Sequence, residues 1–459
     1  MPLREQTVLV LGLGDTGLSM VRWLRGAGAT VRVADSRAEP PHLAAMHAEF
    51  ADIRCDCGPF QASSFDGIDL IALSPGVPLA EPLVQDAVRR GVQVTGDVEL
   101  FARALNKYFP RVRTIAITGS NGKSTVTSMV GAMCSKAGFN TVVAGNIGLP
   151  VLDALGQVLR SGATPDIFVL ELSSFQLETT RHLYPDAATV LNISEDHMDR
   201  YPSLSAYASV KARIFNGEGV QVINRDDPIV DRMAGSGRRV WTFSQTTPVS
   251  PSDFGLIMLD DGVALAQGNR VLMRARELPL AGLHNAANAL AAFALCRAVD
   301  LPEPPLLAAL REFRGLPHRV EFVAEVSAVR YYDDSKGTNV GATVAALAGF
   351  DRPVVLIAGG DGKGQDFAPL AGPVRERARA VLLIGRDAPA IEAALRDTGV
   401  PLQRCASLQD AVAAAASLAQ GDDAVLLSPA CASLDMFRNY AHRAEVFIDA
   451  VRQLPGART

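Results

Sequence analysis

The sequence lacks the features that mark several classes of protein. No apolar run approaches the roughly 20 residues that a membrane-spanning helix needs, and residues 1–6 lack the apolar core of a signal peptide. A net charge of −5 gives no basis for binding nucleic acid or an anionic membrane. The six cysteines are scattered, and the pair Cys55 and Cys57 has no histidine or second pair nearby. We therefore expect a cytoplasmic monomer with reduced thiols that binds neither nucleic acid nor membrane.

What is present fits a large α/β protein. The 459 residues are 48% hydrophobic and 20% charged, which is typical of a globular chain of several domains. Apolar runs that end in Gly or Pro alternate with helical patterns along the chain. We predict three consecutive α/β domains: a Rossmann-like domain at 1–107, a P-loop ATPase-like domain with a mostly parallel sheet at 108–315, and a second Rossmann-like domain at 316–459.

The most informative segment is a glycine-containing loop between a strand and a helix. The apolar run Thr114–Ile117 leads into this loop, whose small residues let backbone N–H groups approach a phosphate. Lys123 adds a positive charge over the terminal phosphates, and the Ser124 hydroxyl can bind Mg²⁺. The full P-loop pattern has a glycine where this chain has Ile117, so the loop is a shortened variant. We predict a nucleoside triphosphate site at Gly119, Ser120, Asn121, Gly122, Lys123, Ser124 and Thr125.

A second glycine pattern lies near the start of the chain. The pattern Gly12-x-Gly14-x-x-Gly17 follows an apolar strand, and the next strand ends in Asp35. This arrangement is typical of dinucleotide binding, and it can equally hold one nucleotide diphosphate at the helix N-terminus. A third strand ends in a turn at Gly76 that suits a ligand. Asp15 lies inside the glycine turn, where an anion beside a pyrophosphate is mildly unfavourable.

Single residues of the middle segment leave alternatives open. Glu171 ends an apolar strand and is either a Mg²⁺ ligand or a helix-capping acid. His197 follows another strand and is either a metal ligand or a core histidine. Lys211 lies on a predicted helix, where a lysine is usually a solvated charge. Asn285 and Asn288 share one helix face, and they either bind a polar heterocycle or cap the helix.

Several blocks of residues, in order along nearly the whole chain, resemble the ATP-dependent Mur ligases. Within that family the set is most similar to the members that add D-glutamate to UDP-N-acetylmuramoyl-L-alanine in cytoplasmic peptidoglycan precursor synthesis. The blocks are Gly119–Thr125, Glu171–Glu178, Asn192–Tyr201, His284–Asn285, Leu316–Arg319, Asp334–Lys336, Gly359–Lys363 and Ser428–Ser433.

The resemblance implies a reaction in which ATP converts the L-alanine carboxylate into an acyl phosphate, which the glutamate amine then attacks. It implies catalytic roles for Lys123, Asn146, His197 and Lys211. It implies that Mg²⁺ is held by Ser124, Glu171, His197 and Lys211, the last as a carbamate whose oxygens suit a hard metal. It also implies that the ATP nucleoside is bound by Asn285, Asn288, Arg319 and Asp334.

The resemblance further implies two substrate sites. The UDP substrate is expected to contact Thr16, Ser36, Arg37, Gly76 and Ser173. The incoming amino acid is expected to contact Lys336, Thr338, Lys363, Ser433 and Tyr440. Two lysines and several hydroxyls suit an amino acid with two carboxylates, but the D-form rests on the resemblance alone.

Three alternatives remain at this point. The first is a ligase of the same superfamily that uses L-glutamate or another amino acid. The second is a nicotinamide-dependent oxidoreductase built on the first glycine pattern, which leaves the phosphate loop unexplained. The third is a non-catalytic nucleotide-gated binding protein, which has no use for Glu171, His197 and Lys211 together.

Overall fold

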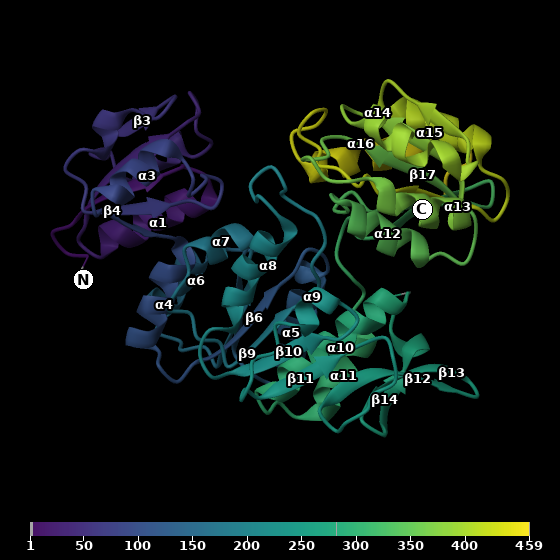
Figure 1. The fold of residues 1–459 in the computed structure, drawn as a ribbon, viewed down its shortest axis with the longest axis horizontal. Coiled ribbons are helices and arrows are strands. Elements are labelled where there is room, and N and C mark those ends of the chain that lie inside the picture. Colours follow the sequence, from purple (N-terminus) through teal and green to yellow (C-terminus); the bar gives the residue numbers. More distant parts are fainter. Residues whose placement is uncertain (1–2, 281, 459) are drawn as a thin grey trace.

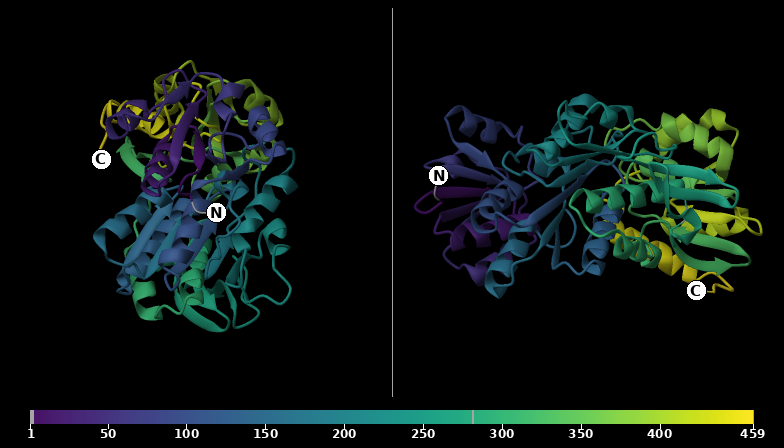
Figure 2. Two further views of the ribbon diagram at one scale, coloured as in Figure 1. Left: turned by 90° about the vertical axis from the view of Figure 1, so that its left-hand side faces the viewer. Right: turned by 90° about the horizontal axis from the view of Figure 1, so that it is seen from below.

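The computed structural model describes residues 3–280 and 282–458, and it confirms three consecutive α/β domains, each with its own sheet. The N-terminal and C-terminal domains lie apart from each other on the same side of the central domain (Figure 1). In the view from below in Figure 2, the N-terminal domain lies at the left, and the C-terminal domain overlaps the right-hand part of the central domain. Within the described residues, no helix is both long enough and apolar enough to cross a bilayer.

The N-terminal domain is a parallel five-stranded sheet in the order β3-β2-β1-β4-β5, as predicted for a Rossmann-like unit. Helices α1 and α2 pack on one face of the sheet and α3 packs on the other, because alternate strand residues point to opposite faces. The elements are β1 (Thr7–Leu11), α1 (Asp15–Gly26), β2 (Thr30–Asp35), α2 (Leu43–Glu49), β3 (Cys55–Cys57), β4 (Leu70–Leu73), α3 (Pro82–Arg89), β5 (Gln93–Thr95) and α4 (Asp97–Tyr108).

The glycine turn between β1 and α1 requires its glycines. Gly12 has a φ of +86°, which side chains other than glycine rarely adopt. A Cβ on Gly17 would lie 1.9 Å from the Gly12 carbonyl oxygen, so only glycine lets α1 approach the strand this closely. The turn therefore brings the N-terminus of α1 against the end of β1, where a phosphate can approach backbone N–H groups.

The central domain has a nine-stranded sheet in the order β14-β13-β12-β11-β10-β9-β6-β8-β7. The part from β7 to β12 is parallel, as predicted, and β12, β13 and β14 form an antiparallel extension. The strands are β6 (Arg113–Thr118), β7 (Thr141–Gly145), β8 (Ile167–Glu171), β9 (Ala187–Val190), β10 (Val220–Asn224), β11 (Val240–Phe243), β12 (Asp253–Leu259), β13 (Gly262–Gln267) and β14 (Arg270–Arg274).

Helices cover both faces of the central sheet. Helices α5, α10 and α11 pack on one face, and α6 to α9 pack on the other. The Ala-rich helix α10 is largely buried, since it packs on β9 to β12 and lies beside α5 and α11. The helices are α5 (Lys123–Lys136), α6 (Val151–Ser161), α7 (Ser174–Glu178), α8 (Leu204–Ala212), α9 (Pro228–Asp231), α10 (Leu283–Ala298) and α11 (Glu303–Glu312).

The C-terminal domain has a six-stranded sheet in the order β15-β16-β20-β17-β18-β19, in which only β15 is antiparallel. Helices α15 and α16 pack on one face and α12, α13 and α14 on the other. The elements are β15 (Glu321–Val326), β16 (Val329–Asp333), α12 (Val340–Ala348), β17 (Val354–Gly359), α13 (Ala371–Arg377), β18 (Ala378–Ile384), α14 (Ala388–Leu395), β19 (Leu402–Arg404), α15 (Leu408–Leu418), β20 (Ala424–Leu427) and α16 (Tyr440–Arg452).

Helix α4 joins the first two domains. It follows β5 of the N-terminal sheet and contacts both α1 and α6. The ring of Phe101 on α4 packs edge-on against Phe168 on β8 at 5.2 Å between centroids. One hydrophobic cluster therefore runs through both domains, whereas the clusters of the C-terminal domain contain described residues of that domain alone. The expected boundaries near residues 107 and 315 stay predictions.

Candidate active site

The phosphate loop lies between β6 and α5, as the sequence predicts. Ile117, at the position of the missing glycine, is a fully buried residue of β6, so the strand simply continues where a longer loop would begin. Gly122 caps α5 in the left-handed region with a φ of +80°. A Cβ at this position would lie 2.8 Å from the Asn288 side-chain oxygen. Glycine is therefore required here, and α10 approaches the loop closely.

Lys123 lies folded along the loop. Its Nζ donates hydrogen bonds to the carbonyl oxygens of Gly119 and Ser120, both at 2.9 Å. Burial lowers the pKa of Lys123, while the charges of Glu171 and Asp196 raise it. Both acceptors are backbone carbonyls and neither is a carboxylate, so within the described residues this charge is available to an incoming phosphate.

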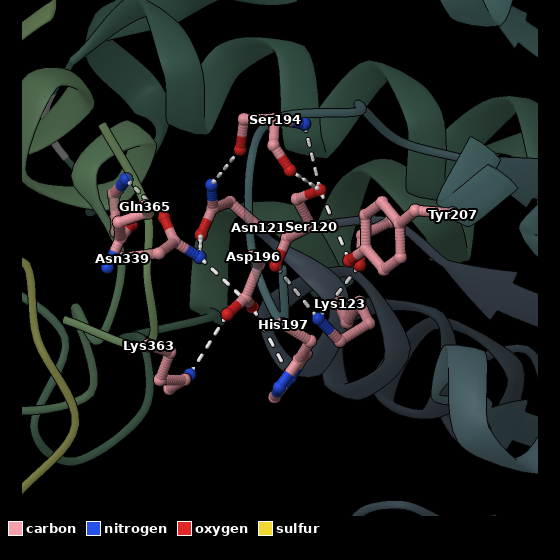
Figure 3. A network of polar contacts seen from close by, with 12 residues as sticks. Ser120, Asn121, Lys123, Ser194, Asp196, His197, Tyr207, Asn339, Lys363 and Gln365 are labelled. Atoms are coloured by element: carbon pink, nitrogen blue, oxygen red, sulfur yellow. Dashed lines mark hydrogen bonds and ion pairs between the residues drawn. The ribbon is translucent and has the colours of Figure 1, made fainter. Parts of the chain in front are cut away.

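The segment that follows β9 holds the loop in place (Figure 3). The Asn192 side-chain oxygen accepts a hydrogen bond from the backbone N–H of Asn121 at 2.7 Å. The backbone N–H of Ser194 donates to the Ser120 hydroxyl at 2.9 Å, and Tyr207 lies 3.4 Å from the same hydroxyl. The loop is therefore fixed by polar contacts before any ligand arrives, which reduces the entropy cost of binding.

Glu171 and Asn146 lie where β8 and β7 end. The Asn146 amide donates to Glu171 Oε1 at 2.7 Å. The other carboxylate oxygen of Glu171, Oε2, is buried and has no hydrogen-bond partner in the described part of the chain. A buried carboxylate oxygen without a partner is costly unless it is protonated or meets a cation. This oxygen is therefore free to coordinate a hard metal ion.

Lys211 is deeply buried, which the sequence did not indicate. Its side chain is 1% exposed, and its Nζ donates to Thr118 Oγ1 at 3.1 Å and to the Gly119 carbonyl at 2.9 Å. Burial, together with the nearby charge of Lys123, lowers the pKa of Lys211 well below its usual value. Both effects favour the neutral form of the Lys211 amine, which lies adjacent to the phosphate loop.

His197 has the left-handed backbone conformation, with a φ of +60°, in the loop after β9. Burial lowers the pKa of its imidazole to about 4, although the neighbouring Asp196 carboxylate, 3.6 Å away, opposes the shift. The ring packs edge-on against Phe175 at 4.6 Å between centroids. The imidazole is neutral at physiological pH and keeps a lone pair that can bind a metal.

The predicted nucleoside site is a cavity of ≈ 130 Å³ between the central and C-terminal domains. Arg319 reaches across the boundary and donates to Ser124 Oγ at 3.2 Å. Burial raises the pKa of Asp334 to about 7, although a hydrogen bond from Ser428 at 2.7 Å opposes this shift. The lining includes Asn121, Gly122, Thr125, Asn285, Asn288, Arg319 and Asp334 of the predicted set, together with Asn192 and His284.

A larger cleft of ≈ 520 Å³ lies between the N-terminal and central domains. Four of the five residues predicted for the UDP substrate line it, together with Asn146 of the central domain. The fifth, Ser173, caps α7 and binds Gln176, which also lines the cleft. The predicted lining residues are Thr16, Ser36, Arg37, Gly76 and Asn146.

Asp35 and Asp15 differ in their surroundings within this cleft. The Asp35 carboxylate accepts the backbone N–H of Leu13 at 2.6 Å and pairs with Arg37 at 2.6 Å. Burial alone raises the pKa of Asp35, but the hydrogen bonds from Arg37 and Leu13 outweigh it, so the pKa is lowered. Asp35 is therefore engaged by the protein itself. Asp15 is 83% exposed, and its carboxylate lies 2.7 Å from the imidazole of His42.

The residues predicted for the amino acid lie in two groups. Lys336 Nζ lies 3.7 Å above the ring of Tyr440, a cation–π contact, and the backbone N–H of Thr338 donates to the Lys336 carbonyl. Ser433 is buried. Lys363 is instead paired with Asp196 of the central domain at 2.9 Å (Figure 3). Its positive charge is therefore already matched by a carboxylate.

Sequence reasoning missed several residues that organise the site. Asn339 donates to the Asn121 side-chain oxygen at 3.0 Å and to Asp196 at 3.4 Å, and so joins two domains. Arg443 is fully buried and donates to the Ser335 hydroxyl and to the carbonyl of Cys431. Asp196 lies beside a histidine in the block Asn192–Tyr201, so the sequence did carry a signal for it. Asn339 and Arg443 gave no signal, because a residue's burial and its contacts across domains are not visible in local sequence.

Comparisons with known proteins agree with this geometry. Family models match three consecutive parts of the chain: the Mur ligase MurD-like N-terminal domain at residues 6–96, the Mur ligase middle domain at 117–296, and the Mur ligase glutamate ligase domain at 318–431. A UDP-N-acetylmuramoylalanine–D-glutamate ligase from Nitrosospira multiformis is 57% identical over 100% of this chain and 98% of its own length. The chain belongs to the Mur ligase family.

Further Mur ligases are similar to this chain in sequence or in structure. A UDP-N-acetylmuramoylalanine–D-glutamate ligase from Methylobacillus flagellatus is 59% identical over 98% of this Mur ligase and 98% of its own length. Among solved structures, UDP-N-acetylmuramate-alanine ligase MurC from Thermotoga maritima superposes with a TM-score of 0.61 at 18% identity, covering 98% of this chain and 99% of that one. MurF from Acinetobacter baumannii also has a TM-score of 0.61, at 15% identity, covering 96% and 93%. The structures support the fold alone.

Proposed function

We propose that this Mur ligase joins D-glutamate to UDP-N-acetylmuramoyl-L-alanine and that ATP drives the reaction. The relatives that are 57% and 59% identical over their full length carry the name of this activity. The observation that carries the proposal is the hydrogen bond between Asn146 and Glu171. Asn146 lines the cleft of the N-terminal domain, and Glu171 ends a strand adjacent to the phosphate loop. A substrate carboxylate at Asn146 would therefore meet the γ-phosphate of ATP.

Each domain takes one reactant in this proposal. The N-terminal domain, with expected bounds 1–107, binds the UDP substrate in the larger cleft. The central domain, 108–315, binds the ATP phosphates, and the ATP nucleoside enters the cavity that it shares with the C-terminal domain. The C-terminal domain, 316–459, binds glutamate. The protein is expected to act as a monomer, and the nucleotide substrates and free thiols support a cytoplasmic location.

The chain's own residues supply the phosphoryl transfer. The substrate carboxylate attacks the γ-phosphate, ADP leaves, and an acyl phosphate forms. Lys123 compensates the negative charge that develops on the transferring group, while Asn146 orients the carboxylate. The glutamate amine then attacks the acyl carbon, loses a proton, and phosphate leaves. Lys336 would bind a glutamate carboxylate, and Lys363 would do so after it exchanges Asp196 for the substrate.

The donor set near the phosphate loop fits Mg²⁺. Glu171 offers a buried oxygen without a partner, Ser124 offers a hydroxyl, and His197 offers a neutral imidazole. We propose that Lys211 carries a carbamate, because a neutral amine reacts with CO₂ and the product supplies two oxygens to a hard metal. When bound, Mg²⁺ would neutralise charge on the phosphate oxygens.

Phosphate release tests the proposed function. The purified protein is assayed with UDP-N-acetylmuramoyl-L-alanine, ATP and Mg²⁺ against a panel of D- and L-amino acids. We expect D-glutamate to give the fastest release, and we expect the Lys123→Ala variant to lose about a hundredfold or more in rate. Faster release with L-glutamate or another amino acid would replace this function with that of a different ligase of the superfamily. No release with any amino acid would contradict a ligase.

A further inference from the structure

The side chain of Arg200 lies between the N-terminal and central domains. Within the central domain its guanidinium makes two hydrogen bonds to Glu178, at 3.2 and 2.7 Å, and lies 4.0 Å above the ring of Phe175. It also donates to two carbonyl oxygens of the N-terminal domain, those of Pro75 at 2.7 Å and Val77 at 3.4 Å. The side chains of Arg200 and Glu178 are each 11% exposed. One buried cation therefore joins two domains.

The segment that Arg200 holds is a wall of the nucleotide-substrate cleft. Ser74, Pro75, Gly76 and Val77 all line that cleft. The Ser74 hydroxyl donates to the carbonyl of Gly12 at 2.8 Å, so the same segment also supports the glycine turn. A shift of this segment would therefore change both the cleft wall and the turn that faces the diphosphate.

The other end of Arg200 is tied to His197. The backbone N–H of Arg200 donates to the His197 carbonyl at 2.9 Å and closes a tight turn. The Phe175 ring beneath the guanidinium also packs against the imidazole of His197 at 4.6 Å. Helix α7, which carries Phe175 and Glu178, lies on the side of the central domain that faces the N-terminal domain (Figure 1). The wall of the cleft and the imidazole of His197 are therefore both held by contacts with Arg200 and the ring of Phe175.

We infer that Arg200 is a positioning residue that keeps the nucleotide-substrate cleft in register with the His197 loop. The inference rests on the proposed function in one respect, namely that the cleft takes the UDP substrate. Arg200 acts through the Pro75–Val77 segment and through Phe175, and it does not touch the reacting atoms. Its loss lets the cleft wall move away from the central domain, so the cleft is less preorganised and binds the UDP substrate more weakly.

The planar guanidinium is suited to this role. It presents several donors in one plane and can serve a carboxylate and two carbonyls at once, while its face stacks on an aromatic ring. A lysine in its place has a single ammonium that cannot reach all of these acceptors. Arg213 is the natural control, because its guanidinium donates to the carbonyls of Leu177 and Glu178 at the same helix α7 but makes no hydrogen bond to the described residues of the N-terminal domain.

Steady-state kinetics of Arg200→Lys and Arg213→Lys test the inference. For Arg200→Lys we expect KM for UDP-N-acetylmuramoyl-L-alanine to rise about tenfold or more, and KM for ATP to stay within about twofold, because the ATP contacts lie elsewhere. For Arg213→Lys we expect both KM values to stay within about twofold. Glu178→Gln weakens the ion pair that holds Arg200, so we expect it to raise KM for the UDP substrate by a smaller factor than Arg200→Lys does. Thermal unfolding of each variant reports folding separately.

An unchanged KM for the UDP substrate in Arg200→Lys would overturn the inference, whether or not the melting temperature falls, because Arg200 would then be merely structural. Equal rises in both KM values would overturn it too. Calorimetric titration with UDP alone separates this inference from the proposed function. We expect Arg200→Lys to bind UDP about tenfold more weakly than the wild type, and equal affinity would contradict the positioning role even if the wild type added no amino acid.

Discussion

The N-terminal domain meets the central domain through a shared hydrophobic core, whereas the C-terminal domain meets it through polar contacts. At the first boundary Phe101 and Phe168 are fully buried against each other. The Glu99 carboxylate on α4 accepts the backbone N–H groups of Arg181 at 2.8 Å and of His182 at 3.0 Å. Removing the N-terminal domain would expose this apolar surface to water, so we expect the boundary to persist through the reaction cycle.

At the second boundary, the contacts are hydrogen bonds and ion pairs. Asn339 binds Asn121, Lys363 pairs with Asp196, and Arg319 binds Ser124. Water can hydrogen-bond to each of these groups if the boundary opens, so their separation loses less than the exposure of an apolar core would. Several of these groups are the ones expected to bind ATP, Mg²⁺ or glutamate, so a ligand can take the place of the partner domain.

The difference between the apolar and the polar boundary indicates that the two have different roles. We propose that the fixed boundary holds the UDP substrate in line with the phosphate loop, and that the polar boundary opens to admit ATP and glutamate and closes around them. In this structure Lys363 pairs with Asp196, and we propose that this ion pair satisfies the half-buried lysine until a carboxylate of the substrate replaces Asp196.

The largest effect is expected at Lys211, which lies adjacent to the phosphate loop. Lys211→Ala removes the proposed carbamate, so we expect activity to fall by about a hundredfold or more and acetate to restore part of it. Lys136→Ala, which removes a surface lysine paired with Glu312, is the control and should retain activity. The measurement is phosphate release with and without acetate. Near-normal activity of Lys211→Ala would contradict the proposed carbamate.

Next comes Phe101→Ala at the apolar boundary. Because Phe101 is fully buried, we expect a loss of about 3–5 kcal/mol in the free energy of unfolding and weaker binding of UDP. Phe447→Ala is the matched control, since Phe447 is also fully buried but lies in the C-terminal domain. It should destabilise the protein without changing UDP affinity. Denaturant unfolding and calorimetry measure both, and unchanged UDP affinity in Phe101→Ala would argue against a fixed boundary.

Asp97 makes the same boundary sensitive to pH. Burial raises the pKa of Asp97 from 3.8 to about 6, although a hydrogen bond from Gln176 opposes the shift. The folded state therefore binds the proton more tightly than the unfolded state does. The resulting contribution favours folding below about pH 4 and is lost as the pH rises through about 6.

Relative to Asp97→Asn, the wild type should thus lose up to about 3 kcal/mol of unfolding free energy between pH 4 and pH 7. Denaturant titrations of both proteins across this range measure the difference between their free energies of unfolding. The contributions of the other acids are common to both proteins and cancel in this difference. A difference that stays constant with pH would show that Asp97 titrates normally.

The smallest effect on stability is expected at the polar boundary. Asn339→Ser keeps an oxygen that can cap α12 and removes the amide that binds Asn121 and Asp196, without adding a charge. We expect a loss of about 1 kcal/mol in the free energy of unfolding, together with a more open C-terminal domain. Asn439→Ser is the matched control, because Asn439 caps α16 in the same way within one domain. Small-angle scattering should show expansion of the first variant alone; equal envelopes would assign Asn339 no role in closure.

The sequence predicted the local parts of this picture and missed the long-range ones. Strand ends, the glycine turns and the helix that carries Lys211 follow from periodicity and from turn chemistry, which are local. The burial of Lys211 and the bridge formed by Asn339 depend on how separate elements dock, and no local pattern encodes that. The resemblance to the Mur ligases supplied roles for Glu171 and His197 that spacing left open between metal ligand, cap and core residue.

The most direct test of the account measures both boundaries in one experiment. Distance distributions are recorded between labels at the exposed positions Arg89, Glu218 and Glu376, one in each domain, with and without a non-hydrolysable ATP analogue and the UDP substrate. We predict that the Glu218–Glu376 distribution narrows and shortens when ligands bind, while the Arg89–Glu218 distribution stays unchanged. A ligand-dependent change at the first boundary equal to that at the second, or none at the second, would contradict the account.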